Sequence, residues 1–191
     1  PFFRTSKQRS WILTGLGSAA MTLASLPFVL DLARKRGDVA VLMQARWLSE
    51  TACRVFQAYL FSDLFMGSIY YRDRVTIIMG WVHHPVYFIL VHFLISWDWT
   101  NIFMLAAVME APTCFLAASN IFPALRHDIL FSILFFSTRI VFHMVLFTLV
   151  LMPTARHAAV GGSFWPAGLF ALAFPMHVVW FSGCINGFIK R

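Results

Sequence analysis

Five apolar stretches of the sequence each carry an ionisable residue near the middle, at the depth where a bilayer would be most apolar. One stretch holds an adjacent pair, His83 and His84, and the other four hold Asp63, Glu110, Arg139 and His177. An ionised side chain at the bilayer centre costs about 2.5–3.5 kcal/mol on insertion scales, so such residues usually face the interior of a helix bundle and serve a function. A layer of them at one depth predicts a buried polar chamber.

The histidine pair could act as general base, nucleophile or metal ligand. Neighbouring residues lie about 100° apart around a helix, so we expect one histidine to enter the chamber while the other touches a neighbouring helix. Asp63 and Glu110 are candidates for orienting or charging a histidine, as the acid does in a catalytic triad. The alternatives are packing histidines held by hydrogen bonds, and a structural ion pair of either acid with Arg139, because a buried arginine needs a partner. We take His83, His84, Glu110 and Asp63 as the candidate catalytic residues.

A second group of candidates would bind lipid. Arg139 and His143 are four residues apart and share one face of a helix, where they could hold a phosphate or carboxylate head group or only satisfy Glu110. We place His177 in the same lipid-binding group. The sequence has none of the H-x-x-x-H and H-x-x-H-H clusters of membrane di-iron enzymes, so we expect no metal and no cofactor. Haem held by two histidines is an alternative with no specific support.

The composition is that of an integral membrane protein. Of the 191 residues, 60% are hydrophobic and 12% are charged, whereas soluble domains are about 45–50% apolar and about 25% charged. A spanning helix needs about 20 predominantly apolar residues. We therefore expect one all-α polytopic membrane domain over residues 1–191, with six transmembrane helices around a polar-lined cavity. The expected spans are residues 11–30, 51–70, 76–96, 102–121, 129–151 and 164–188.

Prolines accompany three members of the polar layer: Pro85, Pro112 and Pro175. A proline inside a helix removes one backbone hydrogen bond and clashes with the carbonyl four residues earlier. In lipid the freed groups need partners, so such breaks are tolerated where they face protein or a wet cavity. An open polar interior is the interpretation we favour. The alternative is that proline is simply commoner in membrane helices than in soluble ones.

The net charge of +7 does not point to nucleic acid, because the basic residues lie at the ends of the expected spans, as in other membrane proteins. One span end, Tyr70 and Tyr71 followed by residues 72–74, has the form of an interfacial aromatic belt with charged anchors. Six spans put both termini on one side, with eight basic residues there against five on the other. That difference favours termini in the cytosol, or in the matrix of a mitochondrion.

Four segments in order resemble the TLC domain family, which includes ceramide synthases, the translocating-chain-associated membrane protein and small lipid-homeostasis proteins. Residues 58–64 are similar to its aromatic-x-x-x-Asp segment, and residues 80–84 to its double-histidine segment. Residues 109–115 are similar to its Glu-x-Ser/Thr-x-Phe segment, and residues 177–181 to its closing His-x-x-Trp segment. The resemblance covers about residues 10–190.

The resemblance implies a six-helix bundle around a cavity for long acyl chains. In ceramide synthases it also implies acyl transfer from acyl-CoA to a sphingoid amine, with His83, His84 and Glu110 at the matching positions. Ceramide synthases have a threonine three residues after the histidine pair, where this chain has Tyr87, and a second aspartate where it has Thr113. The chain therefore resembles the small lipid-homeostasis members more than true ceramide synthases.

We expect a lipid-handling membrane protein that binds an acyl chain or lipid between its helices, with acyl transfer at His83 and His84 as its chemistry if it is an enzyme. Its partners would be membrane lipids and acyl-CoA. The alternative is a non-catalytic, lipid-binding accessory subunit with protein partners in a larger membrane complex. A transporter or proton relay has less support, since no inverted repeat is visible. The resemblance favours the endoplasmic reticulum. The mitochondrial inner membrane is the alternative, given the basic start without Met.

Overall fold

The computed structural model describes residues 5–38 and 46–189, and this part of the chain is helical with turns between the helices. The α-helices are α1 (Ser6–Arg34), α2 (Arg46–Tyr70), α3 (His83–Ser96), α4 (Thr100–Ala106), α5 (Ala111–Ile121), α6 (Asp128–Phe135), α7 (His143–Leu151), α8 (Pro153–Val160) and α9 (Trp165–Ile189). Short 3₁₀ segments are η2 (Arg72–Arg74), η4 (Ala107–Glu110) and η5 (Pro123–Leu125), and π-helical segments are η3 (Ile77–Val82) and η6 (Phe136–Phe142). The predicted all-α class is confirmed.

These elements join into six long rods: α1, α2, η3–α3, α4–η4–α5, α6–η6–α7 and α9. Each rod covers all or nearly all of one of the predicted spans. Four of the rods contain a helix that is long and apolar enough to cross a membrane, namely Ser6–Arg34, Thr100–Ile121, Asp128–Leu151 and Trp165–Gly187. The chain is thus a polytopic membrane protein. The rods α2 and η3–α3 are not among those four, so the count of six spans stays a prediction.

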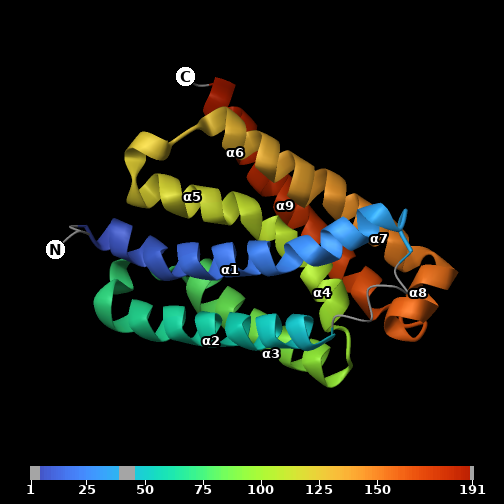
Figure 1. The fold of residues 1–191 in the computed structure, drawn as a ribbon. Helices are drawn as coiled ribbons and strands as arrows, with labels where there is room; N and C mark the ends of the chain where they lie inside the picture. The colour runs from blue at the N-terminus through green and yellow to red at the C-terminus, as the bar shows by residue number, and fades with distance from the viewer. Residues whose placement is uncertain (1–4, 39–45, 190–191) are drawn as a thin grey trace.

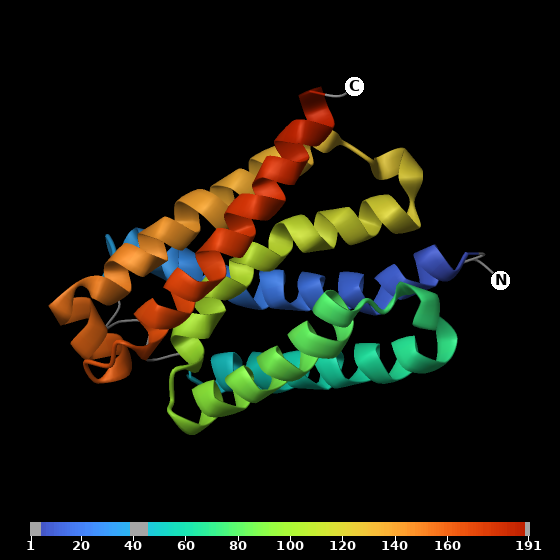
Figure 2. The same cartoon turned by 180° about the vertical axis from the view of Figure 1, so that it is seen from behind.

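Successive rods run antiparallel to each other, because the connections between these long helices are short. The N-terminus, the α2–η3 turn, the α5–α6 turn and the C-terminus lie at one end of the molecule, and the α3–α4 turn and α8 lie at the other (Figures 1 and 2). Helix α1 packs on α5 and α2, α2 packs on α3, and α5 packs on α6. The last helix, α9, packs on α6, η6 and α7. In this order the rods surround a common interior.

Small residues let α1 approach its neighbours closely, as is common between membrane helices. A Cβ atom added at Gly17 would come within 2.6 Å of the Tyr59 ring, and one at Gly15 would lie 3.2 Å from the Cβ of Ala117. The outward faces of the rods are apolar: Leu16 is 65% exposed and Leu172 is 79% exposed. Exposed leucines on helices of this length are what a lipid environment favours.

The backbone departs from α-helical geometry next to the polar layer. The π-segment η3 ends directly before His83, and η6 contains Arg139. Pro112 has no N–H to donate to the Val108 carbonyl, and in η4 that carbonyl accepts from the Ala111 N–H instead. Helix α9, by contrast, continues through Pro175. Irregular helical segments of this kind often occur at functional sites.

Candidate intramembrane site

A cavity of about 820 Å³ lies inside the ring of rods, and every one of the six contributes lining residues. The volume is within the range of about 300–1,000 Å³ that is typical of small-molecule sites. All the site residues predicted from the sequence line it: Asp63, His83, His84, Glu110, Arg139, His143 and His177. The remaining walls are largely apolar, and Lys7, Asp73 and Arg74 line its end near the N-terminus. The structure therefore brings the predicted layer together around one space.

One cluster in the wall joins α2 to α3 through Asp63. Its Oδ2 lies 3.1 Å from Nε2 of His84, and its Oδ1 accepts a 2.7 Å hydrogen bond from the hydroxyl of Tyr71. The side chains of Asp63 and His84 are only 12% and 11% exposed. The carboxylate is thus held on both oxygens. An acid bonded to one ring nitrogen fixes the orientation of a histidine, as in a catalytic triad.

Tyr71 belongs to this cluster and was not recognised from the sequence. Its place after Tyr70 and before charged residues indicated an interfacial belt, yet its side chain is 7% exposed and bonded to Asp63. The interfacial interpretation of Tyr71 was therefore wrong. Asp63 and Tyr71 are eight residues apart, which is about two helical turns, and this spacing was the signal available in the sequence.

His83 occupies a different position from His84. Its ring lies 4.4 Å from that of Tyr87, centroid to centroid, and 5.8 Å from that of His84. It lines the cavity, and its nitrogens make no hydrogen bond to any residue that the structure describes. His84 reaches the neighbouring helix α2 while both rings border the chamber. The π-helical segment η3 ends directly before the pair, and such segments often occur at functional sites.

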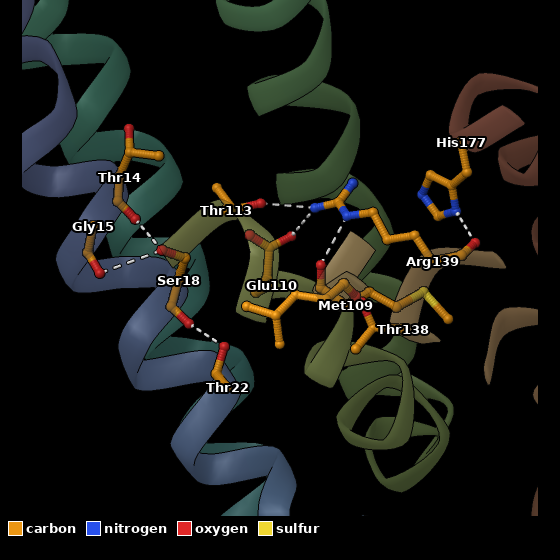
Figure 3. A network of polar contacts seen from close by, with 11 residues as sticks. Thr14, Gly15, Ser18, Thr22, Met109, Glu110, Thr113, Thr138, Arg139 and His177 are labelled. Atoms are coloured by element: carbon orange, nitrogen blue, oxygen red, sulfur yellow. Dashed lines mark hydrogen bonds and ion pairs between the residues drawn. The ribbon is translucent and has the colours of Figure 1, made fainter. Parts of the chain in front are cut away.

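The second cluster is built around Arg139 (Figure 3). Its Nε donates to the Met109 carbonyl at 2.8 Å, and its Nη2 lies 2.8 Å from Oγ1 of Thr113 and 3.3 Å from Oε1 of Glu110. The guanidinium also lies 5.5 Å from the ring centroid of Phe135, within the range of a cation–π contact. Of the two acids, Glu110 thus forms the structural ion pair with Arg139, and Asp63 bonds His84 instead.

Two further histidines tie helices together beside Arg139. Nδ1 of His177 donates to the Arg139 carbonyl at 3.1 Å, and Nε2 of His143 donates to the Phe170 carbonyl at 3.0 Å. Their rings are perpendicular, with centroids 5.0 Å apart. Nδ1 of His143 is buried and has no hydrogen-bond partner within the described part of the chain. Both histidines are packing groups as well as cavity-lining groups.

The charges of the layer nearly balance without a ligand. Asp63 and Glu110 contribute two negative charges and Arg139 one positive charge, which gives −1 when the four histidines are neutral. Arg139 is already matched by Glu110, and only its Nη1 makes no hydrogen bond to a described residue. The pairing with Glu110 is one of the two roles that the sequence left open for Arg139, and binding of an anionic head group stays a prediction.

The described residues contain no group of three or more His, Cys, Asp or Glu placed to hold a metal ion. Six of the seven site residues are engaged with protein partners through the hydrogen bonds above: Asp63, His84, Glu110, Arg139, His143 and His177. Their arrangement can orient a histidine, hold a charge pair and shape an apolar chamber.

The comparisons with known proteins agree with this architecture. The family model of the TLC domain matches residues 13–186, a segment that includes all six rods in whole or in large part and every residue of the two clusters. No curated protein and no solved structure matches the chain. Since the matched segment covers most of the 191 residues, the chain belongs to the TLC domain family.

Proposed function

We propose that this TLC-domain protein handles lipids by binding an acyl chain or a whole lipid in its intramembrane cavity. The observation that carries the proposal is the meeting of a polar layer with a large apolar space: His83 and the Asp63–His84 pair border a cavity of about 820 Å³. An apolar pocket with a few convergent polar groups is the usual form of a small-molecule site. The apolar walls would hold the chain, and the layer would hold its polar end.

Acyl transfer is the reaction that these residues would support. His83 has ring nitrogens that no described residue uses, so it can act as base or as acyl acceptor. As acyl acceptor, a ring nitrogen would attack the thioester carbon of an acyl-CoA, the carbon–sulfur bond would break, and the imidazole proton would leave with the thiolate. The Asp63 carboxylate, one ring away through His84, would stabilise the positive charge that develops. Lys7 and Arg74 at the end of the cavity would attract the phosphates of the donor.

A second function is favoured by a different observation. The Glu110–Arg139 pair is closed by Thr113 and by the Met109 carbonyl, which is the pattern of a layer that stabilises a bundle. A non-catalytic, lipid-binding accessory subunit would need this closure and no reactive histidine. Its apolar outer faces would then be covered by partner proteins of a larger membrane complex. From the resemblance to the TLC domain family we propose the endoplasmic reticulum as the location, with the mitochondrial inner membrane as the alternative. The two termini would lie on the cytosolic or matrix side.

A covalent-capture experiment separates the two functions. Purified protein would be incubated with a long-chain acyl-CoA that carries a terminal alkyne, and adducts would be measured by native and peptide mass spectrometry. If the protein is an acyltransferase, the wild type should carry the acyl mass on the peptide that contains His83. The variant His83→Gln should lose the adduct and keep its bound lipid, because glutamine preserves polarity without a basic nitrogen.

The matched control is His92→Gln, since His92 lies on the same helix α3 but is exposed and does not line the cavity. This variant should carry as much adduct as the wild type. Bound lipid without any acyl adduct in the wild type would support the accessory-subunit function and refute the enzymatic one. If the wild-type protein purified from membranes carries no lipid, both functions are refuted.

A further inference from the structure

The ring of rods has a seam between α3 and α9. Going round the ring, each rod packs on the next from α3 through α2, α1 and α5 to α6, η6 and α7, and then to α9. Among the described elements, α3 and α9 are not one of the pairs that pack extensively on each other. In Figure 2 both helices face the viewer, and they diverge from the end near α8 towards the end that holds the C-terminus.

The cavity extends to both sides of this seam. Helix α9 lines it with residues at helical spacing, including Ala173, Met176 and Trp180, and α3 lines it with Tyr87 and Leu90. All five side chains are half-buried. The outer face of α9 is apolar and strongly exposed: Leu172 is 79% exposed and Val179 is 68% exposed. Apolar wall therefore continues from the outer surface of the bundle into the cavity.

We propose that a membrane lipid enters the cavity sideways from the bilayer, acyl chain first, through the seam between α3 and α9. This inference rests on the proposed lipid binding, and it names the source of the lipid and the route by which the lipid enters. A lipid that moves through the seam keeps its chain in apolar surroundings throughout, whereas the end lined by Lys7, Asp73 and Arg74 would bring the chain past charged groups and water. Exposure of apolar surface to water is the cost that the lateral route avoids.

Chain entry can be followed with a phosphatidylcholine that carries a diazirine in its palmitoyl chain, in vesicles of unlabelled phosphatidylcholine that contain the full chain. Vesicles with the probe are fused with the protein vesicles, samples are irradiated at intervals, and labelling of the α4–α5 peptides that line the cavity is measured. The variant Ala173→Trp enlarges a lining side chain of α9, one of the two helices that flank the seam. Its control, Leu172→Trp, adds the same side chain one residue away on the outer face.

If entry is lateral, Ala173→Trp should lower the rate constant of cavity labelling at least fivefold while the final level stays near that of the wild type. Leu172→Trp should label at the wild-type rate. Equal rate constants for the two variants would overturn the proposal, and so would a lower final level for Ala173→Trp with an unchanged rate constant, because that result describes a filled cavity. Absence of cavity labelling in the wild type at all times would instead refute lipid binding itself.

A second measurement needs no change at the seam. Lys7→Cys, in a chain with Cys53, Cys114 and Cys184 replaced by alanine, would be joined to a large maleimide-polyethylene glycol that covers the charged end of the cavity. Lateral entry predicts the same labelling rate before and after this attachment. A rate that falls with attachment would show entry from the aqueous end and would overturn the proposal even if Ala173→Trp had failed to fold.

Discussion

Removal of Arg139 should strand a buried carboxylate, and the structure sets the scale of the loss. Arg139→Leu removes the hydrogen bonds to the Met109 carbonyl, Thr113 and Glu110. Loss of one partner from a buried pair costs about 3–5 kcal/mol. The Glu110 side chain keeps 29% exposure, so we expect the low end, a loss of about 3 kcal/mol in the free energy of unfolding.

The partner variant should cost less. Glu110→Gln keeps an acceptor for Nη2 of Arg139 and leaves the bonds to Met109 and Thr113, so we expect a loss of about 1 kcal/mol, the usual net contribution of one hydrogen bond. The double variant Glu110→Gln/Arg139→Leu strands no charge and should lose about 2 kcal/mol, where independent effects would add to about 4. The coupling between the two sites should therefore be about 2 kcal/mol.

Reversible unfolding in mixed micelles of increasing sodium dodecyl sulfate content, followed by tryptophan fluorescence, would give these free energies. The control is Arg54→Leu, which breaks an exposed pair with Glu50 whose side chains are 63% and 37% exposed. Such pairs contribute less than about 1 kcal/mol. The assignment of Glu110 and Arg139 to one buried pair would be refuted if the losses in unfolding free energy of the two single variants add up to that of the double variant. It would also be refuted if Arg139→Leu loses no more stability than Arg54→Leu.

Two other variants test packing and orientation. Gly17→Ala should destabilise the protein by about 1–3 kcal/mol in the same assay, because its Cβ would overlap an aromatic ring of α2 and force repacking. The control is Gly168→Ala, which should not destabilise the protein because nothing lies within 4 Å of the added Cβ. Equal losses of stability in the two variants would contradict the close approach of α1 to α2. Tyr71→Phe removes the hydroxyl that holds Asp63 and should lower the rate of acyl capture, while the lipid in the cavity is retained. An unchanged rate would show that the hydroxyl has no part in positioning Asp63 and His84.

The positions of the helical rods and the residues of the polar layer follow from local sequence. Apolar runs of about 20 residues identify rods by themselves, and a residue near the middle of each rod is near the middle of the bundle. For this reason the amino-acid sequence alone indicates one shared depth for six residues, all of which line the cavity: Asp63, His83, His84, Glu110, Arg139 and His177.

Partner choice within the layer did not follow from the sequence. Asp63 and Glu110 are both acids at similar depth, and only the order of rods around the ring puts Glu110 beside Arg139 and Asp63 beside His84. That order depends on long-range packing, such as the close contact of α1 with α5, for which a single sequence carries little signal. The seam between α3 and α9 depends on the same packing.

A lipid held in the cavity should stay bound during purification, and it can be measured directly. Protein purified from membranes in mild detergent would be analysed by native mass spectrometry with lipid identification, for the wild type and for Ala106→Phe. Ala106 is half-buried and lines the cavity, so the added ring should occupy space meant for the chain. We predict a lipid or acyl mass bound to the wild type and less of it bound to Ala106→Phe. A wild type that carries no lipid, or two proteins that carry the same amount, would contradict the account.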